Sequence, residues 1–204
     1  MFKTSICILC GGKSKRFGSR KLFYKVNGKT ILETVYNKLE NHSDDIFLQT
    51  SNDVSLEFYN DLKNITTKIY KDIFNDIGPL GGIYSGLKRA RYDKIFILAG
   101  DLPFIDELIL LELNKYDSFQ IIVPVWENGF IEPLCALYSK EILPIIENQL
   151  DKHDYKISNL FNTVNDSKND RFRIKYLNID RLIQNKRINP HCFKNVNTKE
   201  DLLT

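Results

Sequence analysis

A glycine- and cation-rich segment near the N-terminus directly follows a short apolar run. The apolar run is Ile6–Leu9, and the segment that follows reads Cys10-Gly-Gly-Lys-Ser-Lys-Arg-Phe-Gly-Ser-Arg-Lys21. A buried strand that leads into such a loop can direct backbone N–H groups and cationic side chains toward one polyanion. This order of strand, glycines and cations therefore predicts a site for the phosphates of a nucleotide.

The distribution of charge supports this interpretation. The chain has 26 acidic residues and a net charge of only +3, yet no Asp or Glu occurs before Glu33. The basic residues of the same stretch are Lys3, Lys13, Lys15, Arg16, Arg20, Lys21, Lys25 and Lys29. A solvated basic face or a nucleic-acid patch is the alternative interpretation. Because the glycines and the strand favour a pocket, we do not expect nucleic acid to be the partner.

Two common phosphate-binding loops do not match the spacing of this segment. A Walker loop has four residues between its glycines, followed by Lys and Ser or Thr. Here Gly12 and Gly18 enclose five residues, and Ser19 follows. The G-x-G-x-x-G spacing of dinucleotide-binding folds is not present either.

Length and composition favour one globular domain, which we expect to span residues 1–204. The chain is 43% hydrophobic, and no apolar run approaches the ~20 residues that cross a bilayer. The N-terminus lacks the pattern of a signal peptide, so we expect a cytoplasmic protein with no membrane partner. The four cysteines, Cys7, Cys10, Cys135 and Cys192, are expected to be buried, reduced thiols.

Short apolar runs alternate with helical patterns along the first half. Strands are predicted at residues 2–9, 45–49, 68–70 and 95–99, and helices at residues 30–39, 54–62 and 83–91. This alternation predicts an α/β fold whose mixed, mostly parallel sheet has helices on both faces. Ligands of such sheets bind beyond the carboxyl ends of the strands. The second half is predicted to hold strands at 119–126, 130–138 and 171–176, helices at 140–150 and 157–161, and a loop at 162–170.

Asp101 is the strongest acidic candidate, because it directly follows the apolar run 95–100. A carboxylate at a strand end, opposite a cationic loop, can hold Mg²⁺. A turn or helix-capping role is the alternative, for which Asp106 is better placed. The segment Gly78-Pro-Leu-Gly-Gly82 precedes a helical pattern, where glycines either allow close approach to a ligand or serve helix packing. The segment 195–201 is interpreted as a strand end followed by a helix start.

Taken in chain order, these motifs resemble the molybdenum cofactor guanylyltransferases, a family of nucleotidyltransferases. That family opens with a Leu-Ala-Gly-Gly…Arg-Met-Gly…Asp-Lys loop, and this chain has Leu9-Cys-Gly-Gly12, Arg16-Phe-Gly18 and Lys21 at the same spacing. The later matches are Asp72, Gly78-Pro-Leu-Gly-Gly82, Asp101-Leu-Pro103 and Asn195-Val-Asn-Thr198. The main departures are Arg20 in place of Asp, and Glu132-Pro133 in place of a frequent His-Pro or Gln-Pro.

The resemblance implies a single Rossmann-like nucleotidyltransferase domain, with a nucleotide-binding half at 1–101 and an acceptor-binding half at 102–204. It implies transfer of GMP from GTP to the terminal phosphate of molybdenum-bound molybdopterin, with Mg²⁺ as cofactor and pyrophosphate as the second product. The implied catalytic residues are Arg16, Lys21 and Asp101, of which Asp101 binds the metal. The implied nucleotide-binding residues are Leu9, Cys10, Gly11, Gly12, Lys21, Asp72, Gly82 and Asp101. Asn195 and Asn197 are the implied acceptor-binding residues.

The resemblance also implies protein partners: a molybdenum insertion enzyme, and a molybdoenzyme or its chaperone. Related enzymes that use CTP tend to carry Ala-Ala-Gly in the first loop and to lack the Gly-Pro-Leu segment. Gly11-Gly12 and Gly78–Leu80 therefore favour GTP. Two alternatives stay open: a related nucleotidyltransferase that uses CTP or another phosphorylated acceptor, and a nucleotide-binding accessory protein without turnover.

Overall fold

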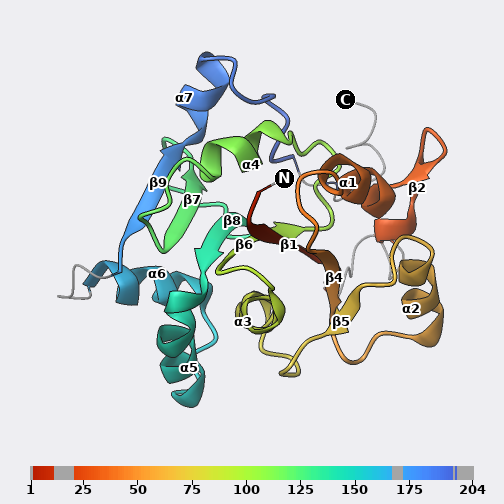
Figure 1. Ribbon diagram of the computed structural model, residues 1–204, viewed down its shortest axis with the longest axis horizontal. Helices are drawn as coiled ribbons and strands as arrows, with labels where there is room; N and C mark the ends of the chain where they lie inside the picture. Colours follow the sequence, from red (N-terminus) through yellow and green to blue (C-terminus); the bar gives the residue numbers. More distant parts are fainter. Residues whose placement is uncertain (1, 12–20, 167–171, 195, 197–204) are drawn as a thin grey trace.

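A central sheet carries the fold. The computed structural model describes residues 2–11, 21–166, 172–194 and 196. Within this part of the chain, seven strands form one sheet in the order β5-β4-β1-β6-β8-β7-β9 (Figure 1). The strands are β1 (Thr4–Leu9), β4 (Ile46–Thr50), β5 (Ile69–Lys71), β6 (Lys94–Ala99), β7 (Ile121–Val125), β8 (Cys135–Ser139) and β9 (Ile174–Asn178).

Strand direction in the sheet is mostly parallel, as predicted. β1 pairs in parallel with β4 and β6, β4 with β5, and β7 with β9. The exception is β8, which is antiparallel to both of its neighbours, β6 and β7. As a result, the carboxyl ends of β1, β4, β5 and β6 meet at one edge of the sheet, where the chain crosses from one side of β1 to the other.

Helices cover both faces of the sheet (Figure 1). One apolar core packs under α1 (Ile31–Leu39), α2 (Leu56–Lys63), α4 (Leu108–Leu113) and α7 (Ile179–Gln184). A second core packs under α3 (Pro79–Arg89), α5 (Leu143–Asp151) and α6 (Ile157–Asp166) on the opposite face. Short elements complete this part of the chain: η1 (Lys21–Phe23), η2 (Lys140–Ile142), β2 (Lys25–Val26) and β3 (Lys29–Thr30). Within the described residues, no helix combines the length and the apolar character of a membrane span.

The start of α1 is fixed by a tight turn and a capping box. Asn27 and Gly28 both have positive φ and form the turn between β2 and β3. The Thr30 hydroxyl accepts from the Glu33 N–H at 3.1 Å, and the Glu33 carboxylate accepts from the Thr30 N–H at 2.6 Å. This reciprocal pair satisfies two backbone donors that a helix start otherwise leaves unpaired.

All four cysteines are buried and free, which confirms the prediction of structural thiols. Cys7 belongs to the core under α3, whereas Cys10 belongs to the core under α1. Successive residues of a strand point to opposite faces, so this separation follows from the spacing of the pair. Burial raises the pKa of each thiol, which keeps all four protonated at neutral pH.

Three predicted boundaries were wrong. α3 begins at Pro79 rather than residue 83, because Gly81 and Gly82 are helical and packed in the interior. β8 begins at Cys135, since residues 130–134 form a single bridge and a turn rather than a strand. α6 continues to Asp166, so the loop predicted from residue 162 is helical in its described part.

Candidate active site

A pocket of about 960 Å³ lies at the edge where the parallel strands end. This volume is within the range typical of small-molecule and cofactor sites. The loops after β1, β4, β5 and β6, together with η1 and the starts of α2 and α3, provide its walls. The lining residues used below are Leu9, Cys10, Gly11, Lys21, Gln49, Asp72, Gly78, Gly82, Asp101 and Leu134.

Lys21 and Asp101 form an ion pair in this pocket. The Lys21 Nζ donates to Asp101 Oδ2 at 2.7 Å, although the two residues are far apart in sequence. The Lys21 side chain is only 7% exposed, whereas that of Asp101 is 30% exposed. The cation is therefore enclosed by protein, and the carboxylate keeps access to the pocket. The structure thus brings together two of the three predicted catalytic residues.

Backbone hydrogen bonds fix the end of β1 beside Asp101. The Gly100 N–H donates to the Leu9 carbonyl at 2.9 Å, and the Cys10 N–H donates to the Gln49 carbonyl at 2.7 Å. A Cβ at Gly100 would lie 3.1 Å from the Leu9 carbonyl oxygen. The close approach of these two segments therefore depends on glycine at position 100.

Asp72 lies on the opposite side of the pocket and is held by Gln49. The Gln49 Nε2 donates to Asp72 Oδ1 at 2.9 Å. Burial raises the pKa of the Asp72 carboxyl, and the hydrogen bond from Gln49 partly opposes that rise. Gln49 is 1% exposed, and its Oε1 is buried without a hydrogen-bond partner. Gln49 is not among the site residues predicted from the sequence. Its amide directly follows the apolar run 46–48, and a polar side chain at such a strand end was the available signal for a site residue.

Gly82 has two roles in the structure. It lines the pocket, as predicted for a nucleotide-binding residue, and it also lies where α3 packs against β1. A Cβ at this position would lie 3.1 Å from Leu9 Cδ2. The packing interpretation of the Gly78–Gly82 segment therefore applies to Gly82. Gly78, with a φ of +69°, forms the turn that starts the helix.

Four predicted site residues lie outside the described residues: Gly12, Arg16, Asn195 and Asn197. Val196 is described, and its N–H donates to the Asp101 carbonyl at 3.3 Å. The C-terminal segment therefore reaches Asp101 at Val196.

The donors around Asp101 suit a metal that is shared with a substrate. Among the residues that the structure describes, no group of three or more His, Cys, Asp or Glu could hold a metal on its own. Mg²⁺ is commonly bound by one or two carboxylates together with substrate phosphates, so the accessible carboxylate of Asp101 fits this mode. Asp106 is committed elsewhere, because its carboxylate accepts from the N–H groups of Leu108 and Asn189 at 3.0 and 2.8 Å. Asp53, Asp72 and Asp76 also line the pocket, and Asp101 is the residue among them that is expected from the sequence to bind the metal.

The sheet with its switch-point pocket, glycine-rich first loop and Lys21–Asp101 pair defines a Rossmann-like nucleotidyltransferase. Residues 6–168 match the MobA-like NTP transferase domain. The chain belongs to this family.

Two curated relatives and one solved structure show the extent of the similarity. The chain is 34% identical to a probable molybdenum cofactor guanylyltransferase of Thermococcus gammatolerans, over 96% of this chain and 95% of the relative. It is 30% identical to the molybdenum cofactor guanylyltransferase of Desulfosudis oleivorans, over 96% and 90%. The crystal structure of molybdopterin-guanine dinucleotide biosynthesis protein A from Archaeoglobus fulgidus superposes with a TM-score of 0.76 at 20% identity, covering 98% of this chain and 95% of that one. The last similarity shows that the fold is shared.

Proposed function

We propose that this nucleotidyltransferase transfers GMP from GTP to the terminal phosphate of molybdenum-bound molybdopterin. The observation that carries the proposal is the Lys21–Asp101 pair in a pocket at the carboxyl ends of four parallel strands. The names of the curated relatives support the choice of nucleotide and acceptor. In this proposal residues 1–101 bind the nucleotide, and residues 102–204 bind the acceptor.

The reaction requires positioning and charge neutralisation more than proton transfer. An oxygen of the acceptor's phosphate forms a bond to the α-phosphorus of GTP, and the bond from that phosphorus to the pyrophosphate oxygen breaks. Because the attacking phosphate is already anionic, no general base is needed. Preorganised cations aimed at the charge that develops are the expected source of the rate enhancement. Lys21 and Arg16 have this role in the proposal.

Asp101 is the residue that would hold Mg²⁺, and the metal would supply positive charge that neutralises the phosphates. Lys21 then keeps the carboxylate in place through the 2.7 Å hydrogen bond from its Nζ. Asp72, which Gln49 fixes by its own hydrogen bond, is assigned to the nucleoside. Leu9, Cys10, Gly11, Gly12 and Gly82 form the wall against the base and phosphates, and Asn195 and Asn197 are assigned to the acceptor.

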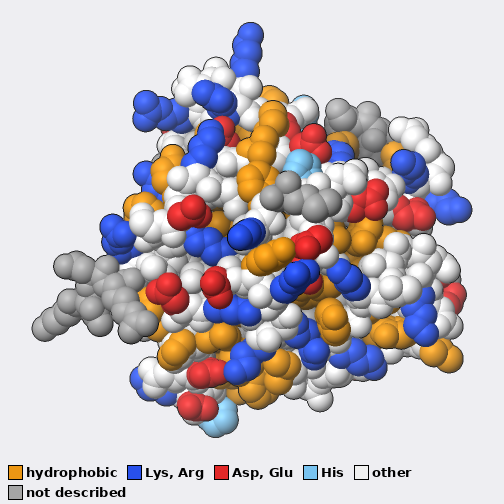
Figure 2. All heavy atoms as spheres, viewed as in Figure 1, with side chains coloured by type: hydrophobic (Ala, Val, Ile, Leu, Met, Phe, Trp, Pro, Cys, Tyr) orange, Lys and Arg blue, Asp and Glu red, His pale blue; other side chains and the backbone are white. Residues whose placement is uncertain are grey.

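Surface charge gives no support to a nucleic-acid partner on the face shown in Figure 2. Acidic and basic side chains alternate over that face, where a nucleic-acid surface would show a continuous basic stripe (Figure 2). The proposed protein partners, a molybdenum insertion enzyme and a molybdoenzyme or its chaperone, follow from the labile product that such a reaction forms.

Competitive turnover tests the choice of nucleotide. GTP, CTP and ATP are offered together at equal concentrations, with molybdopterin as the acceptor and Mg²⁺ present, and the dinucleotide products are separated. Guanine presents an acceptor at O6 and donors at N1 and N2, and a site with polar groups paired to that edge rejects other bases by roughly 10²-fold or more. A preference for CTP would place the protein among the cytidylyl enzymes. Absence of any product would indicate an accessory protein instead.

A further inference from the structure

Glu132 is a half-buried carboxylate on the loop that joins β7 to β8. One of its oxygens, Oε1, accepts from the Trp126 indole Nε1–H at 2.8 Å. In the described part of the chain, no basic side chain forms an ion pair with it. Burial raises the pKa of the Glu132 carboxyl, and the hydrogen bond from Trp126 opposes that rise only in part. A half-buried charge without a cation is costly for a fold and is typical of a ligand site.

The loop that carries Glu132 ends at the wall of the pocket. The Ala99 N–H donates to the Leu134 carbonyl at 2.8 Å, so the pairing of β6 with β8 extends one residue before the start of β8, into this loop. Leu134 lines the pocket, two residues after Glu132. Because β8 runs against β6, its first residues lie at the same edge of the sheet as Asp101.

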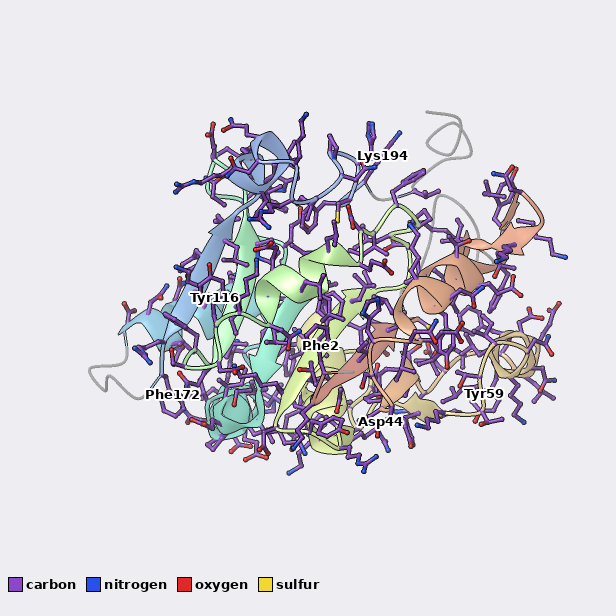
Figure 3. All side chains as sticks on the ribbon, turned by 45° about the horizontal axis from the view of Figure 1, so that its top comes forward. Phe2, Asp44, Tyr59, Tyr116, Phe172 and Lys194 are labelled. Carbon is purple, nitrogen blue, oxygen red and sulfur yellow. The ribbon has the colours of Figure 1, made fainter. Side chains whose placement is uncertain are left out.

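The C-terminal segment connects Glu132 to Asp101 on the other side. The Trp126 ring packs edge-on against Phe193, with centroids 5.8 Å apart. Because the same indole donates to Glu132, this contact places Glu132 near the C-terminal segment. Lys194 extends from the same segment beside Phe104, with its Nζ 5.9 Å from that ring (Figure 3). Val196 then bonds to the Asp101 carbonyl, as described above.

We propose that Glu132 recognises the pterin ring of the acceptor by accepting hydrogen bonds from its aminopyrimidinone edge. A pterin presents two adjacent donors there, the ring N3–H and the 2-amino group. Paired donors of this kind match a carboxylate, as the donors of an arginine side chain do. Trp126 fixes the carboxylate through one oxygen, and its indole, which packs against the buried Phe193, lies beside the ring. The proposal rests on the proposed function, since it names a contact for the acceptor of that reaction.

The ligand itself provides the first test. Fluorescence titration of the wild-type protein, with GTP and Mg²⁺ present, compares 6-hydroxymethylpterin with 6-hydroxymethyllumazine, which carries an oxygen in place of the 2-amino group. Loss of a hydrogen bond to a charged group predicts roughly 10- to 100-fold weaker binding of the lumazine. Equal binding of the two compounds by the wild-type protein, or binding of neither, overturns the proposal without any variant.

The second test uses Glu132→Gln, with Glu127→Gln as the matched control. Glu127 lies on the same loop and is exposed, so its substitution removes the same charge from the same surface. Glu132→Gln should raise the KM for molybdopterin by roughly 10-fold or more, abolish the preference for pterin over lumazine, and leave GTP binding unchanged. Glu127→Gln should match the wild type in all three. An unchanged acceptor KM in a protein that does transfer GMP refutes the role of Glu132, whereas a wild type that makes no dinucleotide refutes the proposed function.

Discussion

Asp101→Asn is the substitution that most directly tests the proposed catalytic ion pair of Lys21 and Asp101. It removes one charge while it keeps an oxygen that can accept from Lys21, whose side chain is 7% exposed. A hydrogen bond to a charged group contributes about 1.5–3 kcal/mol, and the 30% exposure of the Asp101 side chain places the loss toward the lower part of that range. We therefore expect the free energy of unfolding to fall by about 1–2 kcal/mol.

This loss can be measured on the protein without ligands. For a chain of 204 residues, each kcal/mol lowers Tm by roughly 2–4 °C, so Tm should fall by roughly 2–8 °C while the circular dichroism spectrum stays native. Asp117→Asn is the matched control, because its side chain is 88% exposed and pairs with Lys94 at 3.4 Å. Because this carboxylate is exposed, its substitution should leave the midpoint of urea unfolding unchanged.

Turnover should respond far more strongly than stability. Loss of the carboxylate proposed to hold the metal should lower pyrophosphate release by roughly 10²-fold or more, measured with GTP, Mg²⁺ and molybdopterin. A folded Asp101→Asn variant that keeps near-normal pyrophosphate release would refute the assignment of the metal to Asp101. Unchanged stability would separately refute the energetic role of the ion pair.

Three further substitutions test other parts of the structure. Lys21→Ala should lower kcat/KM by roughly 10²-fold or more in the same pyrophosphate assay. A rate near that of the wild type would show that the Lys21 ammonium does not stabilise the charge that develops in the transition state. Gly100→Ala places a Cβ 3.1 Å from the Leu9 carbonyl oxygen, so we expect a loss of about 1–3 kcal/mol in urea unfolding, and an unchanged midpoint would contradict the close approach. The pKa of Glu33 is lowered, chiefly by its hydrogen bond from the Thr30 N–H. Its contribution to stability is therefore present above the unfolded pKa of about 4.3 and is lost as pH falls through the lower folded value, so acid should destabilise the wild type more steeply than Glu33→Gln. Equal slopes would show that the cap adds nothing.

The first half of the chain was largely predictable because its signals are local. Buried parallel strands give continuous apolar runs, so the predicted strand at 95–99 differs from β6 by one residue. The predicted helix at 30–39 begins one residue before α1, whose capping box depends only on residues three apart. The edge of the sheet that holds Asp101 also followed, since it depends only on the order of strands and helices.

The errors arose where tertiary packing overrides local preference. Gly81 and Gly82 disfavour a helix when considered alone, yet both are buried in the first turn of α3, and Gly82 packs against Leu9. The polar segment after Phe161 was interpreted as a loop, although Val164 at its centre is buried and anchors the last turns of α6.

The contacts of the site could not be predicted from sequence either. Lys21 and Asp101 were predicted as separate site residues, but nothing local indicates that they form an ion pair at 2.7 Å. The bond from Gln49 to Asp72 joins two strands in the same way. Such contacts depend on the three-dimensional placement of strand ends, which composition and periodicity do not encode.

The reversed direction of β8 has a consequence for how this architecture can diversify. A parallel strand must be reached by a crossover that spans the whole sheet, whereas β7 and β8 are joined at the ligand edge by the short loop 126–134. Insertions or substitutions in that loop can alter the rim of the pocket at Leu134 while η1, which holds Lys21, and β6, which leads to Asp101, keep their places. The rim of the pocket and its central ion pair can therefore change independently of each other.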